Sequence, residues 1–388
     1  MPVKNRFAEL LPEITGWRRD FHQHPELNYD VQRTAGRVAE LLRGFGVDEV
    51  VEGIGRTGVV GIIKGKSDRS GRVIGLRADM DALPINEITG VEYASTTANV
   101  MHACGHDGHT AMLLGAAKYL AETRNFDGTA VVIFQPAEEG GGGGLAMLED
   151  GLAERFGIDE FYGMHNMPGI PVGQFAIRPG AIMAATDQFD IKVIGRGGHA
   201  GKPNDVIDTL LVAAHIVVAL QSIVARNVDP VKSGVVSTSV LTTDSTAHNV
   251  VPGVVMMHGT ARSLDPGVRD QLQEGIIRIA TNVAAAFSAR AEVVYERGYP
   301  VTVNDAEMTG HAADAARAVA GDVDTGVQPM MAGEDFSYML EARPGAYIFV
   351  GNGDTPMLHQ AAYNFDDNAI PFGCSWYVQM VENRMPAV

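Results

Sequence analysis

The sequence predicts an α/β protein, a mixed sheet flanked by helices, with a smaller α+β domain inserted into its chain. Two observations support this fold class. Four short apolar runs are continuous rather than alternating, which is typical of strands buried on both faces of a helix-covered sheet; they span residues 73–76, 131–134, 161–164 and 347–350. Between residues 183 and 294, the predicted segments follow the β-α-β-β-α-β order of a ferredoxin-like domain.

The segments around the four runs have helical patterns. Residues 5–24 repeat apolar side chains at helical spacing, and this helix is expected to end near His24, because a residue before proline avoids the helical conformation. A second helix is predicted over 31–45, ending at a pair of glycines. The apolar run 110–120 and residues 305–320 are predicted as further helices.

The middle of the chain forms a complete arrangement of its own. An alternating strand is followed by a long apolar helix, two strands, a helix and a last strand; these span 187–193, 205–225, 234–241, 254–260, 266–288 and 291–295. The residues on both sides of this block each supply parts of one candidate site. We therefore predict a discontinuous outer domain, residues 1–182 and 295–388, that carries an inserted domain, residues 183–294.

Length, charge and cysteine content narrow the class of protein. A chain of 388 residues exceeds the usual size of a single core, so two domains are expected. A net charge of −17 argues against nucleic-acid binding and gives no basic face for an anionic membrane. Two distant cysteines form no disulfide framework, and the charged N-terminal stretch has no signal-peptide pattern. A cytoplasmic protein without a membrane-spanning segment is expected.

Each of the four apolar runs leads to acids or histidines. In open α/β sheets, ligands bind outside the carboxyl ends of the strands, so these side chains are expected at one edge. They are Asp79 and Asp81 after the first run, Glu138 and Glu139 after the second, His165 after the third, and His359 beyond a Gly-rich loop after the fourth.

The loop Cys104-Gly105-His106 precedes the predicted helix 110–120. The positive end of a helix favours a thiolate, and two donors one residue apart on a loop can face one ion. Sulfur, nitrogen and oxygen donors together suit zinc, or cobalt, nickel or manganese. Five ligands exceed one tetrahedral shell, so we predict two ions that share a bridging ligand; the candidates are Cys104, His106, Glu139, His165 and His359.

The adjacent carboxylates of Glu138 and Glu139 repel each other unless a cation lies nearby. One can bind metal while its neighbour takes a proton from water, whose pKa a metal ion lowers to about 7. Asp79 and Asp81 have two open interpretations, as carboxylates that orient a ligand histidine and as strand-end turn residues.

Three residues of the inserted domain are candidate substrate contacts. His199, in a loop of small residues, could donate a hydrogen bond to an oxyanion. Arg262 could hold a substrate carboxylate, and Asn249 could add an amide contact. Taken singly, each fits a structural role as well.

The motifs together resemble those of one family. Their order and spacing are similar to the metal-dependent aminoacylase and carboxypeptidase G superfamily, in its hippurate hydrolase and auxin–amino acid conjugate hydrolase branch. The resemblance covers essentially the whole chain, and the Cys-Gly-His-Asp motif is specific to that branch. The matching segments are residues 77–84, 102–109, 135–139, 164–166, 197–200, 333–336, 358–359 and 363–365.

The resemblance implies a dinuclear-metal catalytic domain with a lid domain, through which such proteins usually form homodimers. It implies that the five candidate ligands hold two divalent ions and that Glu138 is the general base and acid. His199, Asn249 and Arg262 would then come from a lid, that of the partner subunit in a dimer. Other branches have His-x-Asp where this chain has Asp79-Met80-Asp81, and the thiolate of Cys104 would offset the missing histidine.

The activity implied is hydrolysis of the linear amide of a small N-acyl amino acid, such as an acetyl or benzoyl derivative. The alternative within the superfamily is a metallo-dipeptidase or carboxypeptidase. Outside it, Cys104 could be the nucleophile of a cysteine amidase with His106 or His109 as base. A metal-dependent binding protein would require a broken ligand set or the loss of Glu138, and all of these residues are present.

A chelator separates the metal-dependent enzyme from the cysteine amidase. Dialysis against a strong chelator is expected to abolish amide hydrolysis, and added zinc, manganese, cobalt or nickel is expected to restore it. Full activity after the metal content has fallen to zero would instead identify a thiol enzyme.

Overall fold

The computed structural model describes residues 5–387, which divide into two compact units. Unit 1 comprises the chain up to residue 180, residues 303–328 and the chain from residue 335 onward. Unit 2 comprises residues 181–302 and 329–334. Unit 2 therefore extends beyond the predicted insert, 183–294, at both ends. It also includes a short return segment, in which Met330 forms a β-bridge to Met183.

Unit 1 contains an eight-stranded mixed sheet in the order β1-β2-β4-β3-β5-β16-β6-β15. The four predicted apolar runs form its centre as β4, β3, β5 and β16, which are parallel neighbours. The mixed sheet confirms the predicted fold class. The strands are β1 Glu49–Ile54, β2 Gly58–Lys64, β3 Val73–Asp79, β4 Thr129–Gln135, β5 Glu160–Met167, β6 Phe175–Ala176, β15 Val323–Asp324 and β16 Gly345–Gly351.

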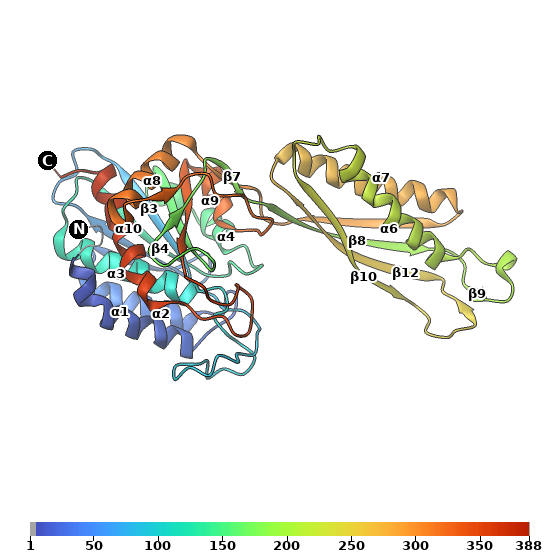
Figure 1. Ribbon diagram of the computed structural model, residues 1–388, viewed down its shortest axis with the longest axis horizontal. Helices are drawn as coiled ribbons and strands as arrows, with labels where there is room; N and C mark the ends of the chain where they lie inside the picture. The colour runs from blue at the N-terminus through green and yellow to red at the C-terminus, as the bar shows by residue number, and fades with distance from the viewer. Residues whose placement is uncertain (1–4, 388) are drawn as a thin grey trace. The chain divides into compact units, whose positions relative to one another are not determined.

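Helices cover the sheet of unit 1 on both faces (Figure 1). On the face that carries the largest core cluster, the alternating side chains of Ile74, Leu76 and Ala78 are buried against α3 and its neighbours. The short helices α4 and α9 also contact the sheet. The helices are α1 Asn5–Gln23, α2 Gln32–Phe45, α3 His106–Thr123, α4 Gly143–Glu149, α5 Leu152–Arg155, α8 Ala306–Ala320, α9 Phe336–Ala342 and α10 Ile370–Arg384, with a 3-10 turn at Asp367–Ala369.

Local signals set the ends of the first two helices. α1 stops at Gln23, two residues before Pro25, as the sequence predicts. α2 ends at Gly46, whose φ of +76° is the left-handed conformation that glycine adopts without strain. Its N–H group bonds to the carbonyl oxygens of Arg43 and Leu42.

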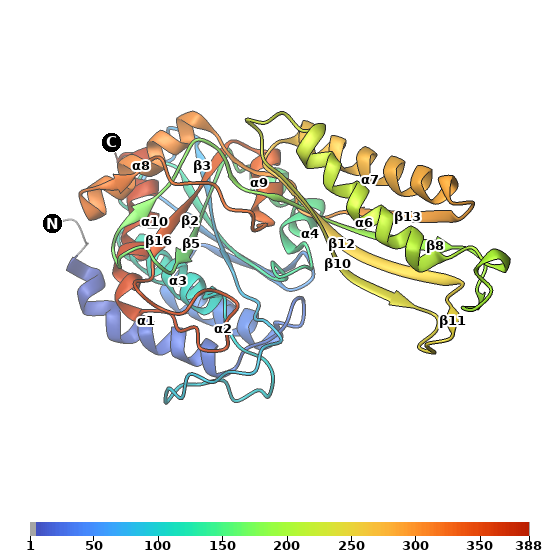
Figure 2. The ribbon, with the colours of Figure 1, turned by 45° about the vertical axis from the view of Figure 1, so that its right-hand side comes forward.

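Unit 2 has the order β8-α6-β10-β12-α7-β13, which is β-α-β-β-α-β. Its four strands pair in the order β10-β12-β8-β13, and α6 and α7 lie side by side (Figure 2). The bounds are β8 Ala185–Ile194, α6 Thr209–Arg226, β10 Gly234–Thr243, β12 Val254–Ser263, α7 Pro266–Ala286 and β13 Arg290–Arg297. Short strands β9 Gly198–His199 and β11 Val250–Val251 pair with each other, as do β7 Gly180–Met183 and β14 Thr302–Asn304.

Helix α6 begins later than its predicted start at residue 205. Residues Pro203–Asp205 form a 3-10 turn, and Asp208 caps the helix by accepting the N–H groups of Leu210 and Leu211. Within the described residues, α6 is also the one helix long and apolar enough to span a membrane. In this fold it packs on β10 and β12 through Val212, Ile216, Leu220 and Ile223.

Candidate metal centre

The carboxyl ends of the central strands of unit 1 bring the predicted residues together. Asp79, the last residue of β3, pairs in register with Gln135, the last residue of β4. His165 lies near the end of β5, opposite Phe349 of β16. The turn that follows β4 carries Glu138 and Glu139. The edge predicted from the sequence therefore exists in the fold.

The five predicted ligands and Glu138 form overlapping groups. In each group the potential ligand atoms lie within 4.8 Å of one another; the groups are Cys104-His106-His165, Cys104-Glu139-His359 and His106-Glu138-Glu139. Within them, Cys104 Sγ is 3.4 Å from His165 Nε2. Glu139 Oε1 is 3.2 Å from His359 Nε2 and 4.0 Å from His106 Nε2.

Backbone carbonyls fix the orientation of two of the imidazoles. His106 Nδ1 lies 2.8 Å from the carbonyl oxygen of Asp81, and His165 Nδ1 lies 2.6 Å from that of Asn166. An Nδ1–H donor in these bonds leaves the Nε2 lone pair of each ring directed into the cluster. His106 Nε2 is buried and has no hydrogen-bond partner. A buried nitrogen lone pair without a hydrogen-bond partner, close to a thiol and carboxylates, fits a site for a metal cation.

The charges of the cluster also fit a cation. Burial, reinforced by Glu139 and Glu138, raises the pKa of the Cys104 thiol well above its usual range. Burial opposes protonation of His106, but Asp79 and Asp81 outweigh it and raise its pKa to about 10. Buried carboxylates contribute to both shifts, and divalent ions bound here would balance their negative charge.

The turn that carries the two glutamates is held by Asp81. Its two carboxylate oxygens accept the backbone N–H groups of Glu138 and Glu139, at 2.9 and 3.1 Å. The residue before them, Ala137, has a φ of +55°, a strained value for a residue with a side chain. Asp81 thus positions both glutamates and, through its carbonyl, His106.

Asp79 is engaged by neighbouring side chains on both of its oxygens. Oδ1 accepts from His109 Nδ1 at 2.7 Å, and Oδ2 accepts from Arg77 Nη1 at 2.7 Å. His109 Nε2 in turn accepts the backbone N–H of Asn166 at 2.9 Å. With both nitrogens used, His109 supports the centre through Asn166, the neighbour of His165.

Arg77 and Asn166 are buried, had no role in the sequence-based prediction, and connect these loops through hydrogen bonds. Arg77 also bonds to Gln135 and to Asp335, and Asp335 accepts the N–H of Gly144 in the first turn of α4. Asn166 donates to the carbonyl of Cys104 and accepts the hydroxyl of Tyr363; these bonds measure 2.6 and 2.7 Å. Arg77, Asp335, Asn166 and Tyr363 all lie in the motif segments, but the two pairs join residues up to 258 positions apart, and no local pattern reveals such pairs.

The helix-end histidines lie outside these groups. His22 bonds to Asp107 at 2.8 Å and to Glu87 at 3.3 Å, so it joins α1 to the residue after His106. His24 is exposed and bonds to the carbonyl of Asp20. Both imidazoles thus bond to protein groups outside the metal centre.

The three candidates of unit 2 do not all meet. His199 lies on β9 opposite Val250 of β11, and the N–H of Ala200 bonds to the carbonyl of Asn249, so His199 and Asn249 are neighbours. Arg262 lies near the other end of β12, opposite Thr186. Arg262 lies eight positions after Val254, the first residue of β12, a span of about 27 Å at ~3.4 Å per residue.

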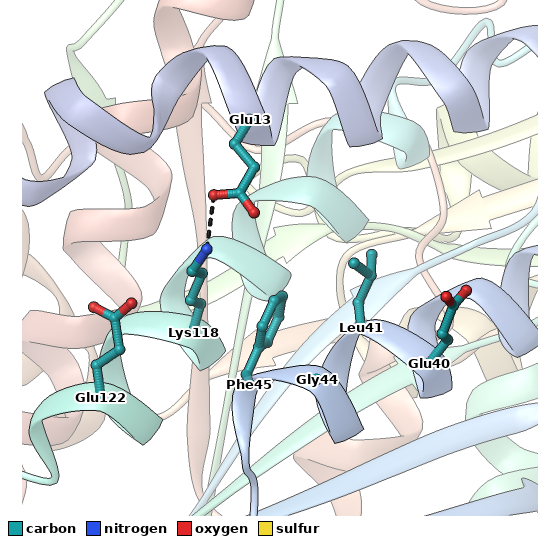
Figure 3. A pocket seen from close by; sticks show the side chains of 7 residues that line it. All are labelled: Glu13, Glu40, Leu41, Gly44, Phe45, Lys118 and Glu122. Atoms are coloured by element: carbon teal, nitrogen blue, oxygen red, sulfur yellow. Dashed lines mark hydrogen bonds and ion pairs between the residues drawn. The ribbon is translucent and has the colours of Figure 1, made fainter.

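A cavity of about 440 Å³ opens elsewhere in unit 1, between α1, α2 and α3 (Figure 3). Lys118 in this cavity bonds to Glu13 at 2.7 Å and lies near the rings of Trp17 and Phe45. It contains none of the predicted site residues.

The chain matches the model of peptidase family M20/M25/M40 over residues 75–383. It belongs to this family. It is 43% identical to a hippurate hydrolase of Campylobacter jejuni, over 96% of this chain and 98% of that protein. It is 40% identical to an N-acetyl-L-cysteine deacetylase of Bacillus subtilis, over 94% and 86%. Among solved structures, a dinuclear metal-binding M20 peptidase of Bacillus subtilis superposes with a TM-score of 0.85, at 32% identity over 98% and 100% of the two chains.

Membership of the M20 family and these relatives make the chain a hydrolytic enzyme, an amidohydrolase. This agrees with the class expected from the sequence motifs.

The ion pair of His22 predicts a pH-dependent stability. Burial opposes its charged form, but Asp107 and Glu87 outweigh it and raise the pKa of His22 to about 9, from about 6.5 in an unfolded chain. The stabilisation of roughly 3 kcal/mol is therefore complete below pH ~6.5 and is lost as the pH rises through about 9. In urea unfolding, the stability difference between the wild type and His22→Gln is expected to shrink between pH 6 and pH 9.5.

The matched control is His24→Gln, an exposed histidine at the same helix end. Its stability relative to the wild type over the same pH range gives the background for the loss of an exposed imidazole. A constant gap between wild type and His22→Gln across this range would contradict the protonated pair.

Proposed function

We propose that this protein hydrolyses the amide bond of N-acyl amino acids with two divalent metal ions, releasing a carboxylic acid and a free amino acid. The observation that carries the proposal is the overlap of groups that bring together Cys104, His106, Glu139, His165 and His359, with Glu138 beside His106 and Glu139. The hippurate hydrolase and N-acetylcysteine deacetylase relatives support an N-acyl amino acid as the substrate class. A cytoplasmic location remains part of the proposal.

The donor set favours two ions that share one ligand. Cys104, His106 and Glu139 each belong to two of the three groups described above, so a shared ligand would come from among these three residues. Zinc, manganese, cobalt and nickel all accept such sulfur, nitrogen and oxygen donors. When bound, these ions polarise the amide carbonyl and acidify water.

Glu138 is proposed to move the proton. Its carboxylate belongs to the same group as His106 and Glu139, while its backbone N–H is fixed by Asp81. As general base, Glu138 takes a proton from the attacking water, and it then gives that proton to the leaving amine. Asp81 and Asp79 act as positioning residues, through the glutamate turn and through His109 respectively.

The remaining contacts are proposed for unit 2. His199 would donate to the oxyanion, Asn249 would add an amide contact, and Arg262 would hold the substrate carboxylate. His199 and Asn249 lie at β9 and β11, and β11 ends three residues before the start of β12, whereas Arg262 lies about 27 Å from that start at ~3.4 Å per residue. One unit 2 is then not expected to bring all three to a small substrate. We therefore propose a homodimer formed through unit 2, in which His199 and Asn249 serve the partner's active site.

The carboxypeptidase alternative has support from two thermostable carboxypeptidases of Saccharolobus solfataricus, each 39% identical to this chain. A panel of N-acetyl, N-benzoyl and indoleacetyl amino acids beside unblocked dipeptides separates the two activities. N-acyl amino acids are expected to be the better substrates.

Replacement of Glu138 tests the assignment of the base. Glu138→Gln should retain two metal ions per chain and lose about a hundred- to ten-thousandfold in kcat, since the amide cannot take up the proton. The matched control is Glu139→Gln at the adjacent position, which should lower the bound metal content. Metal is measured by elemental analysis after dialysis. Near-normal turnover by Glu138→Gln would remove Glu138 from the mechanism.

Mixed dimers test whether His199 acts across subunits. Glu138→Ala and His199→Ala homodimers should each be inactive, but random exchange of subunits should restore about a quarter of wild-type activity, because half of the dimers then hold one complete site. If both residues act within one chain, no exchange restores activity.

A further inference from the structure

An arginine at the edge of unit 1 has no part in the proposed mechanism. Arg56 lies in the three-residue connection between β1 and β2 and is exposed. Among the residues that the structure describes, none forms a hydrogen bond or ion pair with its guanidinium. Its partner is the ring of Tyr29, whose centroid lies 4.0 Å from Arg56 Cζ. All five guanidinium N–H donors thus remain available to a ligand.

The backbone of Arg56 is strained. Its φ is +78°, and the N–H of Thr57 bonds to the carbonyl of Gly55 at 3.2 Å. This φ and this bond match the rare γ-turn of positive φ, a conformation that costs free energy for a residue with a side chain. Glycine would adopt this conformation without strain, whereas the arginine side chain adds a cost at this position.

The stacked pair lies beside the turn that carries the glutamates. Val59 of β2 pairs with Phe134 of β4, so the β1–β2 connection emerges at the carboxyl end of β4. The Tyr29 hydroxyl donates to the carbonyl of Gly141 at 2.8 Å. The preceding residue, Asn28, accepts the N–H of Ala137.

Charged groups of the metal centre act on Tyr29, which agrees with its position beside the glutamate turn. Burial raises the pKa of the Tyr29 hydroxyl, the cation of Arg56 opposes that shift, and Asp335 and Asp81 add to it. Arg56 is thus an unpaired cation next to an acidic centre, in a protein of net charge −17. A carboxylate substrate that approaches this protein meets overall repulsion, which a local cation offsets.

We propose that Arg56, held by Tyr29, binds a carboxylate of the substrate at the active-site edge of unit 1 and so selects anionic N-acyl amino acids. This inference rests on the proposed function. The ligand is a carboxylate that reaches Arg56 while the scissile amide lies at the glutamate turn. It has three possible sources: the acyl group, the amino-acid side chain and, in place of the proposed contact to Arg262, the α-carboxylate.

Three pairs of substrates, each a carboxylate and its neutral amide, distinguish these sources. N-succinyl-alanine with N-succinamoyl-alanine tests the acyl group, and N-acetylglutamate with N-acetylglutamine tests the side chain. N-acetylalanine with N-acetylalaninamide tests the α-carboxylate. The measured quantity is the ratio of kcat/KM for acid over amide, with KM and kcat determined separately for the metal-loaded dimer.

Arg56→Met keeps an unbranched side chain and removes the charge. For one pair, the acid-to-amide ratio is expected to fall about ten- to a hundredfold, mainly through KM, as for the loss of a charge-assisted hydrogen bond. The amide of that pair should change less than about twofold, and added salt should weaken the wild-type preference. Arg56→Lys should retain part of the ratio, because an ammonium keeps the charge without the bidentate geometry.

The control is Arg155→Met. Arg155 is likewise exposed and stacked, with its Cζ 5.3 Å from the centroid of the Phe156 ring. It lies just before β5, at the amino ends of the central strands and so away from the carboxyl ends that carry the metal centre. Its replacement should leave all three ratios unchanged.

Two results would overturn the inference. In one, Arg56→Met and Arg56→Lys keep the wild-type ratio for all three pairs. In the other, Arg155→Met lowers the ratios as much as Arg56→Met does, which would show a general effect of net charge. A wild-type protein that hydrolyses none of the six substrates would instead refute the proposed function. A lower thermal stability of Arg56→Met with unchanged ratios would assign the stacked pair to hairpin stability alone.

Discussion

The excess of negative donors in one buried interior is the constraint on which the rest of the site depends. Four carboxylates and a thiol lie close together there, and burying such groups without a cation is unfavourable. Separate hydrogen bonds fix the position of these side chains and of the neighbouring histidines. Asp81 holds the glutamate turn, Arg77 and His109 hold Asp79, and backbone carbonyls hold His106 and His165. The arrangement is therefore already assembled for metal ions.

The sequence revealed the central strands and the ligand types, because both depend on local patterns. Continuous apolar runs identified β3, β4, β5 and β16, and the residues after them identified the site edge. The bonds of Arg77 to Asp335 and of Asn166 to Tyr363 could not be inferred, because they join residues hundreds of positions apart. The late start of α6 depended on one capping residue, Asp208, that periodicity does not register. Backbone strain at Ala137 and Arg56 leaves no trace in composition.

The strand register of unit 2 carries information about assembly. Arg262 is separated from the segment that carries His199 and Asn249 by most of the length of β12. The paired strands hold that distance fixed, and this is the reason that the proposed recognition of one small molecule by all three residues invokes a homodimer.

His359 differs from the other candidate ligands in its surroundings. Its side chain is 54% exposed, its backbone has a φ of +62°, and its N–H is tied to the carbonyl of Ala103 beside Cys104. Cys104, His106 and His165 are buried. Of the five candidate ligands, His359 is therefore the most exposed to solvent. In the proposed metal centre, exchange of an ion with the medium, and its capture by competing chelators, would begin at this imidazole.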